Sequence, residues 1–198
     1  MRFVGNDDLS HEERERLGKL FPIEIVEYNP SWPRLFKEEA RFLRERFGPE
    51  LIVRIEHYGS TAVPGLAAKP VIDILVEITS FEAAKDGIQP VLEGLGYGYN
   101  WYSGHMVFFK GYFSEGAPRY HLHMAPGDHT IMDGLLFRDY LLKHPEAARE
   151  YETLKYRLAE IHHFDREAYT EAKTDFVREV TELAKWELGE IPKPGTHG

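Results

Sequence analysis

Runs of apolar residues predict a β-sheet in the first two thirds of the chain. Leu51 to Ile55 and Val71 to Ile78 are apolar runs bounded by turn residues, and the second carries an acid, Asp73. Arg119 to Ala125 alternates, so its basic residues lie on one face of a strand and its apolar residues on the other. Shorter runs predict three further strands, Ile23 to Tyr28, Tyr97 to Trp101 and Met106 to Lys110.

Helical periodicity and capping signals predict helices in the segments between and after these strands. Ser10 with Glu13 fits a capping box, and Gly18 is expected to end that helix at about Leu17. Ser31 is the expected cap of the next helix, which Gly48-Pro49 ends. Further helices are expected from Phe81 to Leu95, Thr130 to Lys143, Pro145 to about His163 and Asp165 to about Leu188.

Composition narrows the class of protein. The chain has 198 residues, of which 42% are hydrophobic and 29% charged, as in an ordinary globular protein. A net charge of -9 argues against extended nucleic-acid binding, and the lack of cysteine excludes disulfides and thiolate metal sites. The N-terminus lacks the apolar core of a signal peptide, and no apolar run approaches the roughly 20 residues that span a bilayer. We therefore expect a cytoplasmic protein without a membrane partner.

A Gly-Ser turn and an acid-bearing strand mark the segment from His57 to Glu77. Glycine and serine bring bare backbone N–H groups and a hydroxyl close to a ligand. A carboxylate inside a buried strand is costly unless it is paired, bound to a metal or at an open site. We interpret Gly59, Ser60 and Asp73 as one side of a phosphate or metal site. The alternative is a tight turn with an acid held by a nearby backbone group or arginine.

This segment, H-Y-G-S-T-A-V-P-G-L-A-A-K-P-V-I-D-I-L-V from His57, resembles the signature of the GrpB family, an uncharacterised branch of the polymerase-beta-like nucleotidyltransferase superfamily. The resemblance covers roughly residues 22–185 and continues in N-P-S-W-P at 29–33, R-Y-H-L-H at 119–123, F-R-D-Y-L at 137–141 and Y-T-E-A-K-T-D-F at 169–176. It implies a divalent metal, Mg²⁺ or Mn²⁺, at Asp73. The superfamily usually has a second acid two residues on, where this chain has Leu75. Glu77 shares the face but lies roughly 13 Å from Asp73, too far to share one ion.

The resemblance and the predicted elements together indicate an α+β fold. We expect a nucleotidyltransferase-like, mixed, mostly antiparallel sheet with helices on one side and a C-terminal helical segment. The expected parts are an N-terminal helical arm in 1–20, an α/β core in 21–126, a helical segment closing the cleft in 127–190 and a disordered tail in 191–198.

His121 and His123 form an H-x-H pair on one predicted strand. Such a pair places both imidazoles on one face about 6–7 Å apart, a spacing that can chelate one metal. The resemblance implies that this strand neighbours Asp73, where imidazoles replace carboxylates and favour Zn²⁺ or another transition metal over Mg²⁺. His57 is a further candidate ligand or base. The alternatives are an anion-contacting or structural pair, and a hydrogen-bonded strand-end histidine at position 57.

Three basic residues are candidate contacts for a phosphorylated ligand. Lys69 lies in the loop before the Asp73 strand, and Lys173 falls four residues after Tyr169, on or beside an inward helix face. Arg138 is the third, with a local ion pair to Asp139 as an equal alternative. Four further histidines are expected at the surface: His105, His129, His162 and His163.

The leading hypothesis is a protein that binds a nucleotide or other phosphorylated small molecule and transfers a nucleotidyl or phosphoryl group, with Asp73 holding the metal. One alternative is a non-catalytic ligand-binding or regulatory module, acting by family analogy on a CoA-biosynthetic enzyme. Another is a metal-dependent hydrolase that uses the H-x-H strand with Asp73 and His57.

Overall fold

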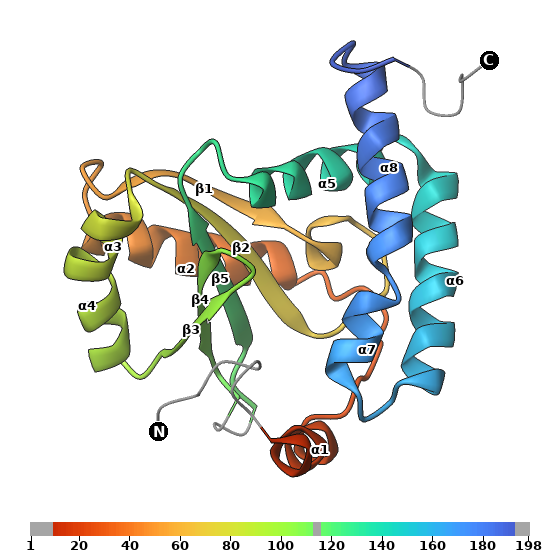
Figure 1. Ribbon diagram of the computed structural model, residues 1–198, viewed down its shortest axis with the longest axis horizontal. Coiled ribbons are helices and arrows are strands. Elements are labelled where there is room, and N and C mark those ends of the chain that lie inside the picture. Colours follow the sequence, from red (N-terminus) through yellow and green to blue (C-terminus); the bar gives the residue numbers. More distant parts are fainter. Residues whose placement is uncertain (1–9, 113–115, 193–198) are drawn as a thin grey trace.

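Five strands form one mixed sheet in the computed structural model, which describes residues 10–112 and 116–192 (Figure 1). Their bounds are β1 Ile52–Tyr58, β2 Val71–Ile78, β3 Gly98–Tyr102, β4 His105–Lys110 and β5 Arg119–Ala125. The order across the sheet is β1-β2-β5-β4-β3. Only the β2–β5 pair is parallel among these neighbours, and the other three pairs are antiparallel. The predicted mixed, mostly antiparallel sheet is confirmed.

Helices α2 (Trp32–Arg46), α3 (Phe81–Gly87) and α4 (Gln89–Gly94) pack on one face of the sheet, which we call the core face (Figure 1). That face carries the alternating apolar residues of β2 and β5, such as Ile74 and Leu122, which are fully buried. Because successive side chains of a strand point to opposite faces, the residues between them lie on the other face. We call that second face, which carries Asp73, the site face.

The C-terminal helices pack on the loop between β1 and β2. They are α5 (Gly134–Lys143), α6 (Pro145–Ile161), α7 (Arg166–Glu171) and α8 (Thr174–Glu187), preceded by the 3₁₀ turn η3 (Thr130–Asp133). Val63 and Leu66 of the loop are buried in one cluster with Phe137, Tyr151 and Val180. Burying one such aliphatic side chain stabilises the fold by about 1.5–3 kcal/mol. This packing therefore fixes the loop over the end of β2.

Helix α1 (His11–Leu20) begins with the predicted capping box of Ser10 and Glu13. The prediction that Gly18 ends this helix at about Leu17 is wrong, because the helix continues through Gly18 to Leu20. A Cβ at Gly18 would collide with the backbone carbonyl of Phe164. This glycine therefore permits close packing of two backbones rather than ending the helix.

Two further local predictions fail wholly or in part. Ile23 to Tyr28 is not a strand, because it pairs only through an isolated bridge between Val26 and Ala68. Ser31 is the N-cap residue of α2, as predicted, but its side chain makes no capping hydrogen bond, and its N–H donates to Asn29 Oδ1 at 2.9 Å.

Two predicted helices are divided. The segment 81–95 breaks at Ile88, between α3 and α4. Pro90 lies in the first turn of α4, where its missing N–H is tolerated, whereas in one continuous helix it would remove a hydrogen bond. The segment 165–188 breaks between α7 and α8, and Lys173 directly precedes α8.

The division of the chain into arm, core, helical segment and tail stays a prediction. Residues 1–9 of the arm and 193–198 of the tail lie outside the described residues. Within the described part of the chain, none of the helices combines the length and apolar character that crossing a bilayer requires.

Candidate metal and anion site

The turn after β1 brings the backbone against Asp73. Tyr58, the last residue of β1, pairs with Asp73 in the antiparallel register. Gly59 follows with a φ of 69° and a ψ of -172°, a conformation that is essentially restricted to glycine. A Cβ on Gly59 would also lie 2.7 Å from Asp73 Oδ2. The glycine of the predicted Gly-Ser turn is therefore needed both for the backbone angle and for the approach to the carboxylate.

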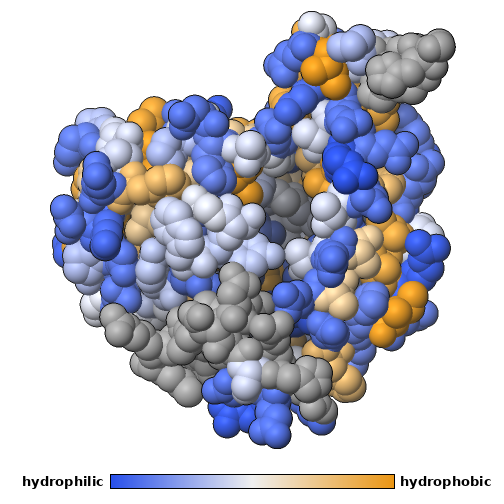
Figure 2. Space-filling view, viewed as in Figure 1, coloured by the Kyte–Doolittle hydropathy of each residue, from blue (hydrophilic) through white to orange (hydrophobic). Residues whose placement is uncertain are grey.

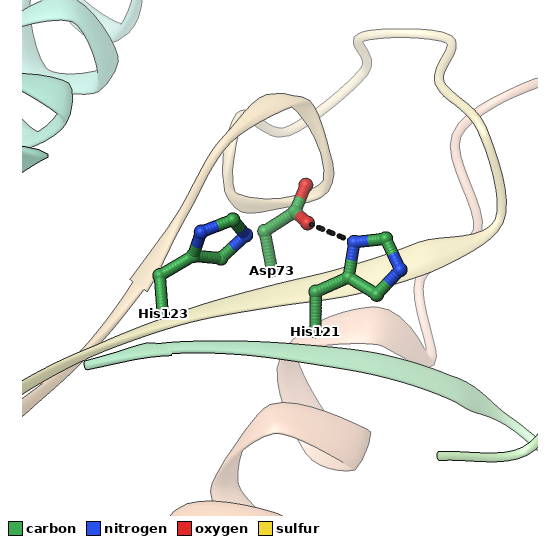
Figure 3. Close-up of side chains that lie close together, drawn as sticks. All are labelled: Asp73, His121 and His123. Carbon is green, nitrogen blue, oxygen red and sulfur yellow. Dashed lines mark ion pairs between the residues drawn. The ribbon is translucent and has the colours of Figure 1, made fainter. Parts of the chain in front are cut away.

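The parallel pairing of β2 with β5 places the two histidines beside the acid. Asp73 pairs with His121, and Leu75 pairs with His123, so all of these side chains share the site face. Asp73 Oδ1 lies 3.5 Å from His121 Nδ1. Among the described residues, Asp73, His121 and His123 each offer a ligand atom, and these atoms lie within 4.8 Å of one another. Figure 3 shows the carboxylate between the two rings.

His121 and His123 each contact a further side chain through one ring nitrogen. The Tyr112 hydroxyl lies 2.6 Å from His121 Nε2. His105 Nε2 lies 2.9 Å from His123 Nδ1, and His105 Nδ1 lies 3.4 Å from the Ser103 carbonyl. A carbonyl can only accept, so His105 carries its proton on Nδ1, accepts at Nε2 from His123, and leaves His123 Nε2 with a free lone pair. This is the tautomer that a metal ligand needs.

His105 was expected at the surface, and that prediction is wrong because the residue is only 2% exposed. It lies on β4, which pairs with β5, and its side chain packs beside the ring of His123 at 5.2 Å between centroids. A single histidine in a short strand gives no sign of a partner on the neighbouring strand. Sequence reasoning therefore had no signal for it.

Burial and neighbouring charges set the protonation of this group. Burial works to raise the pKa of Asp73, but the hydrogen bond from His121 and the electrostatic effect of His121, His123 and Lys69 hold it below its usual value. Burial lowers the pKa of His123 to about 3, against the opposing effect of the Asp73 charge. At neutral pH the group is therefore an ionised carboxylate beside a neutral imidazole, the forms that bind metals.

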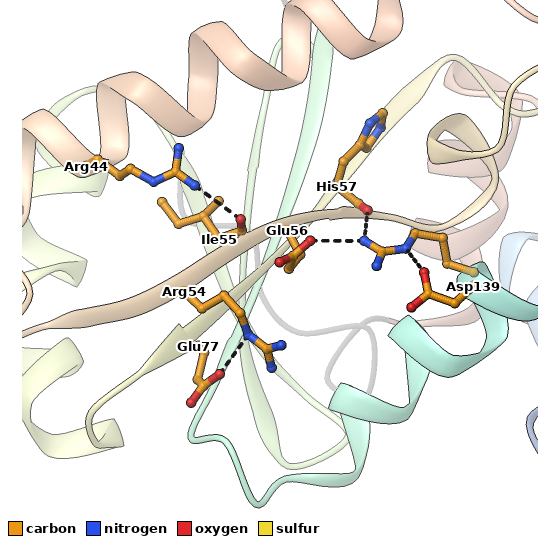
Figure 4. Close-up of polar contacts among 8 residues, drawn as sticks. Arg44, Arg54, Ile55, Glu56, His57, Glu77 and Asp139 are labelled. Atoms are coloured by element: carbon orange, nitrogen blue, oxygen red, sulfur yellow. Dashed lines mark hydrogen bonds and ion pairs between the residues drawn. The ribbon is translucent and has the colours of Figure 1, made fainter. Parts of the chain in front are cut away.

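His57 does not join this group. It pairs with Ile74 across the β1–β2 register, which puts it on the core face. Its ring stacks on Phe36 of α2 at 4.8 Å, and its Nε2 lies 3.0 Å from the Thr61 hydroxyl. Figure 4 shows the ring on the α2 side of β1, away from the Glu56 carboxylate. The prediction of a metal ligand at position 57 is therefore wrong, because the register of β1 places Tyr58 rather than His57 on the face that carries Asp73.

Arg138 is engaged by protein groups. Its guanidinium donates to Glu56 at 3.1 Å, to the His57 carbonyl at 2.7 Å and to Asp139 at 2.7 Å (Figure 4). The local ion pair with Asp139, the alternative in the sequence analysis, is therefore present. These contacts tie α5 to β1 and leave the residue in a structural role.

Lys69 and Lys173 lie together near the acid. Their Nζ atoms lie over the ring of Tyr169, 5.2 Å and 4.4 Å from its centroid. The charge of Asp73 acts on both lysines. The hydroxyl of Ser60 is a hydrogen-bond partner of the Tyr151 hydroxyl on α6. The surface is hollowed between the sheet and α8, and many of the side chains along its rim are hydrophilic (Figure 2).

Two further cations, Lys155 and Arg166, act on Lys69 but were not candidates from the sequence. Lys155 did leave a signal. It is spaced four residues from both Tyr151 and Ala159, so a lysine interrupts the apolar stripe of α6.

The donor set suits a transition metal. One carboxylate and two imidazoles on adjacent strands are ligands for Zn²⁺, Fe²⁺ or a similar ion, whereas Mg²⁺ prefers oxygen ligands alone. Glu77, the other acid of β2 on this face, is paired with Arg54 at 3.0 Å. The residues present therefore fit a divalent ion held by three protein ligands.

Comparisons with known proteins identify the relatives of this chain. The family model described as GrpB protein matches residues 22–183. The UPF0157 protein YqkA of Bacillus subtilis is 40% identical over 173 residues, covering 84% of this chain and 49% of YqkA. A dephospho-CoA kinase of Mycolicibacterium paratuberculosis is 29% identical over 188 residues, covering 80% of this chain and 45% of the kinase. The chain thus spans about half the length of these two relatives.

A solved structure is similar over the same part of the chain. The crystal structure of the conserved protein GrpB from Enterococcus faecalis superposes with a TM-score of 0.73 at 34% identity, covering 84% of this chain and 100% of that one. The family model alone matches well over half of the sequence. The chain therefore belongs to the GrpB family.

Proposed function

We propose that this protein binds a nucleotide or another phosphorylated small molecule at a divalent metal ion and transfers its phosphoryl or nucleotidyl group. One observation carries the proposal: a three-ligand group, Asp73, His121 and His123, lies next to the paired ammonium groups of Lys69 and Lys173. Metal ligands and cations side by side are what phosphate-ester chemistry requires, because that chemistry depends mostly on positioning and charge stabilisation.

Each residue has a role in this proposal. Asp73, His121 and His123 hold the ion, which when bound supplies Lewis acidity toward phosphate oxygens. Lys69 and Lys173 neutralise charge on the phosphate. Gly59 and Ser60 place the turn against the acid and offer a hydroxyl to the same ligand. The two imidazoles favour Zn²⁺ or Mn²⁺ over Mg²⁺ as the ion.

Metal binding and turnover are tested on one preparation. Chelator-treated protein is titrated with Zn²⁺ and with Mn²⁺, and then incubated with nucleoside triphosphates, whose products are separated by chromatography. We expect metal binding and product formation to be lost together in Asp73→Asn. The matched control is Asp86→Asn, an exposed acid of α3. Wild-type protein that binds neither ion would overturn the proposal.

The products also separate transfer from hydrolysis. A metal-dependent hydrolase using the same three ligands would use water as the acceptor, releasing nucleoside diphosphate with free phosphate or nucleoside monophosphate with pyrophosphate. A transferase would release nucleoside diphosphate or pyrophosphate only when an acceptor molecule is added, and that acceptor would then carry the phosphoryl or nucleotidyl group. Two imidazoles and one carboxylate are also a ligand set of metal hydrolases, which is why this outcome is measured.

A non-catalytic role is the second candidate. One relative of the chain is named a dephospho-CoA kinase, and the aligned region is less than half of that protein. We propose on this basis that the fold can act as a module beside a CoA-biosynthetic enzyme, binding a phosphorylated ligand without turnover. Addition of this protein to a dephospho-CoA kinase assay tests it, with a change in kinase rate as the expected result.

A further inference from the structure

Three lysines from separate parts of the chain gather beside the proposed metal site. Lys69 comes from the loop before β2, Lys155 from α6 and Lys173 from the junction of α7 and α8. Lys155 is only 2% exposed, its Nζ donates to the Ala67 carbonyl, and it lies 4.9 Å from the centroid of the Tyr151 ring. A lysine is almost never so buried unless it is paired.

The charges in this cluster are not balanced by the chain. The charges that act most strongly on Lys69 are Lys173, Arg166, Asp73 and Lys155, and only Asp73 is negative. Lys155 has one acid near it, Glu152, which also accepts from the Ala67 N–H at 3.4 Å. Excess positive charge is unexpected in a chain whose net charge is -9. Lys155 is buried, and Lys69 and Lys173 are half-buried. Because uncompensated buried charge is costly, an anion bound among these lysines would offset that cost.

We propose that Lys69, Lys155 and Lys173, flanked by Arg166, form a subsite for a phosphate group that carries two or more negative charges. This inference rests on the proposed function and narrows its substrate to a phosphate monoester or a diphosphate. A phosphodiester carries a single charge per phosphate and leaves most of the cationic excess in place. The linkages inside a nucleic acid are therefore excluded as the group that binds here.

The cluster also predicts that anion binding changes the protonation of these lysines. Burial, followed by the like charges around it, lowers the pKa of Lys69 to about 7. Burial lowers the pKa of Lys155 to about 7 as well, with Glu152 opposing and Lys173 adding to the effect. Burial lowers the pKa of Lys173 to about 8, with Asp73 opposing. The other ionisable groups facing the cluster are Tyr151 and Tyr169, whose pKa values are raised by burial, together with the Arg166 and Glu152 charges already named. An arriving anion favours the protonated lysines, so binding takes up protons near neutral pH.

The experiment uses the full chain after removal of metal by a chelator. Pyrophosphate affinity is measured by titration calorimetry at pH 7.5, and sulfate and methyl sulfate are compared as competitors. Sulfate is a dianion that does not titrate near neutral pH, and methyl sulfate is its monoanionic counterpart. We expect sulfate to compete at least about tenfold better, and its binding to take up roughly one proton in weakly buffered solution.

Lysine variants locate the binding to this cluster. Lys69→Met and Lys173→Met are each expected to weaken pyrophosphate binding by about 10- to 100-fold, the usual effect of removing a hydrogen bond to a charged group. Lys37→Met, an exposed lysine of α2, is the matched control and should change nothing. Circular dichroism of each variant establishes that it is folded.

The outcomes separate this inference from the function on which it rests. Equal competition by the two sulfates, absent proton uptake, or full affinity in folded Lys69→Met would each overturn the inference. Such results would leave metal binding by Asp73 and the histidines untouched. Conversely, a protein that binds pyrophosphate at the lysines but takes up no metal retains the subsite and loses the proposed chemistry.

Discussion

Replacing Lys155 by methionine should stabilise the protein while weakening its affinity for anions. The ammonium is buried on the apolar stripe of α6, where its Nζ donates to the Ala67 carbonyl and the Glu152 carboxylate is nearby. Methionine keeps an unbranched chain of similar length and removes the charge. The substitution therefore tests whether this lysine is retained for stability or for a ligand.

The magnitude follows from the proton that folding displaces. In the unfolded chain Lys155 stays protonated up to its ordinary pKa near 10.5, whereas in the folded chain its pKa is about 7. One pKa unit corresponds to about 1.4 kcal/mol, so the folded state is penalised by about 4 kcal/mol at pH 7 and by about 2 kcal/mol at pH 9. The unfolded state binds more protons across this range, so stability rises with pH. The penalty is full below pH 7 and disappears as pH rises toward 10.5.

The variant also loses something. The Ala67 carbonyl and Glu152 are left without this partner, at a cost of about 1–3 kcal/mol. We therefore expect Lys155→Met to exceed the wild type in stability by roughly 1–3 kcal/mol at pH 7 and to differ little from it at pH 9. The change of about 2 kcal/mol between the two pH values depends only on proton linkage and is the sharper quantity.

Urea unfolding of both proteins at pH 7 and pH 9, in buffers free of phosphate and sulfate, measures this change. Lys37→Met is the control, and its stability difference from wild type should be the same at both pH values because this lysine is exposed. A stability difference for Lys155→Met that does not vary with pH would show that the buried amine keeps an ordinary pKa. Lys155 would then no longer support the proposed anion subsite, which would rest on Lys69 and Lys173.

Three further changes test the metal site and its surroundings. His105→Leu should weaken Zn²⁺ binding by about 10- to 100-fold in a competition titration, because it removes the acceptor that orients a ligand, and His105→Gln should restore part of the loss; equal affinity in both variants would contradict this. His57→Gln should leave Zn²⁺ affinity within about twofold of wild type while lowering the melting temperature, because its ring packs on the core face; a tenfold loss of affinity would return it to the ligands. Gly59→Ala should destabilise by about 1–3 kcal/mol in urea and also weaken metal binding by displacing Asp73. Gly65→Ala has a similar positive φ but open space around its Cβ, so it should lose stability alone.

How far the sequence predicts the site depends on what fixes each side chain. Strands β2 and β5 were predicted with their observed bounds because apolar runs and strict alternation are strong signals. Alternation also fixed the shared face of His121 and His123. The pairing of these strands came from the family resemblance, since a crossover between parallel strands leaves no local mark.

His57 shows where such reasoning stops. The loop between β1 and β2 is long, and its length does not set the antiparallel register. A shift of one residue decides whether position 57 or 58 faces Asp73, and the structure pairs Tyr58 with that acid. His105 fails for a different reason, because its partner lies on another strand. Both the register of β1 against β2 and the placement of β4 beside β5 depend on tertiary packing.

The position of Leu75 connects the metal site to the lysines. Leu75 is 1% exposed and pairs with His123, so the strand position where the superfamily usually has a second acid is filled by an apolar side chain. In the proposed metal site the other two ligands would be the imidazoles of His121 and His123 on β5, which add no negative charge. A divalent ion held by one carboxylate remains positive overall, and Lys69 and Lys173 lie close enough to feel the same carboxylate. With histidines in place of an acid, the bound ligand must therefore bring more negative charge to balance the ion. The cluster of Lys69, Lys155 and Lys173 favours a ligand with the same high negative charge.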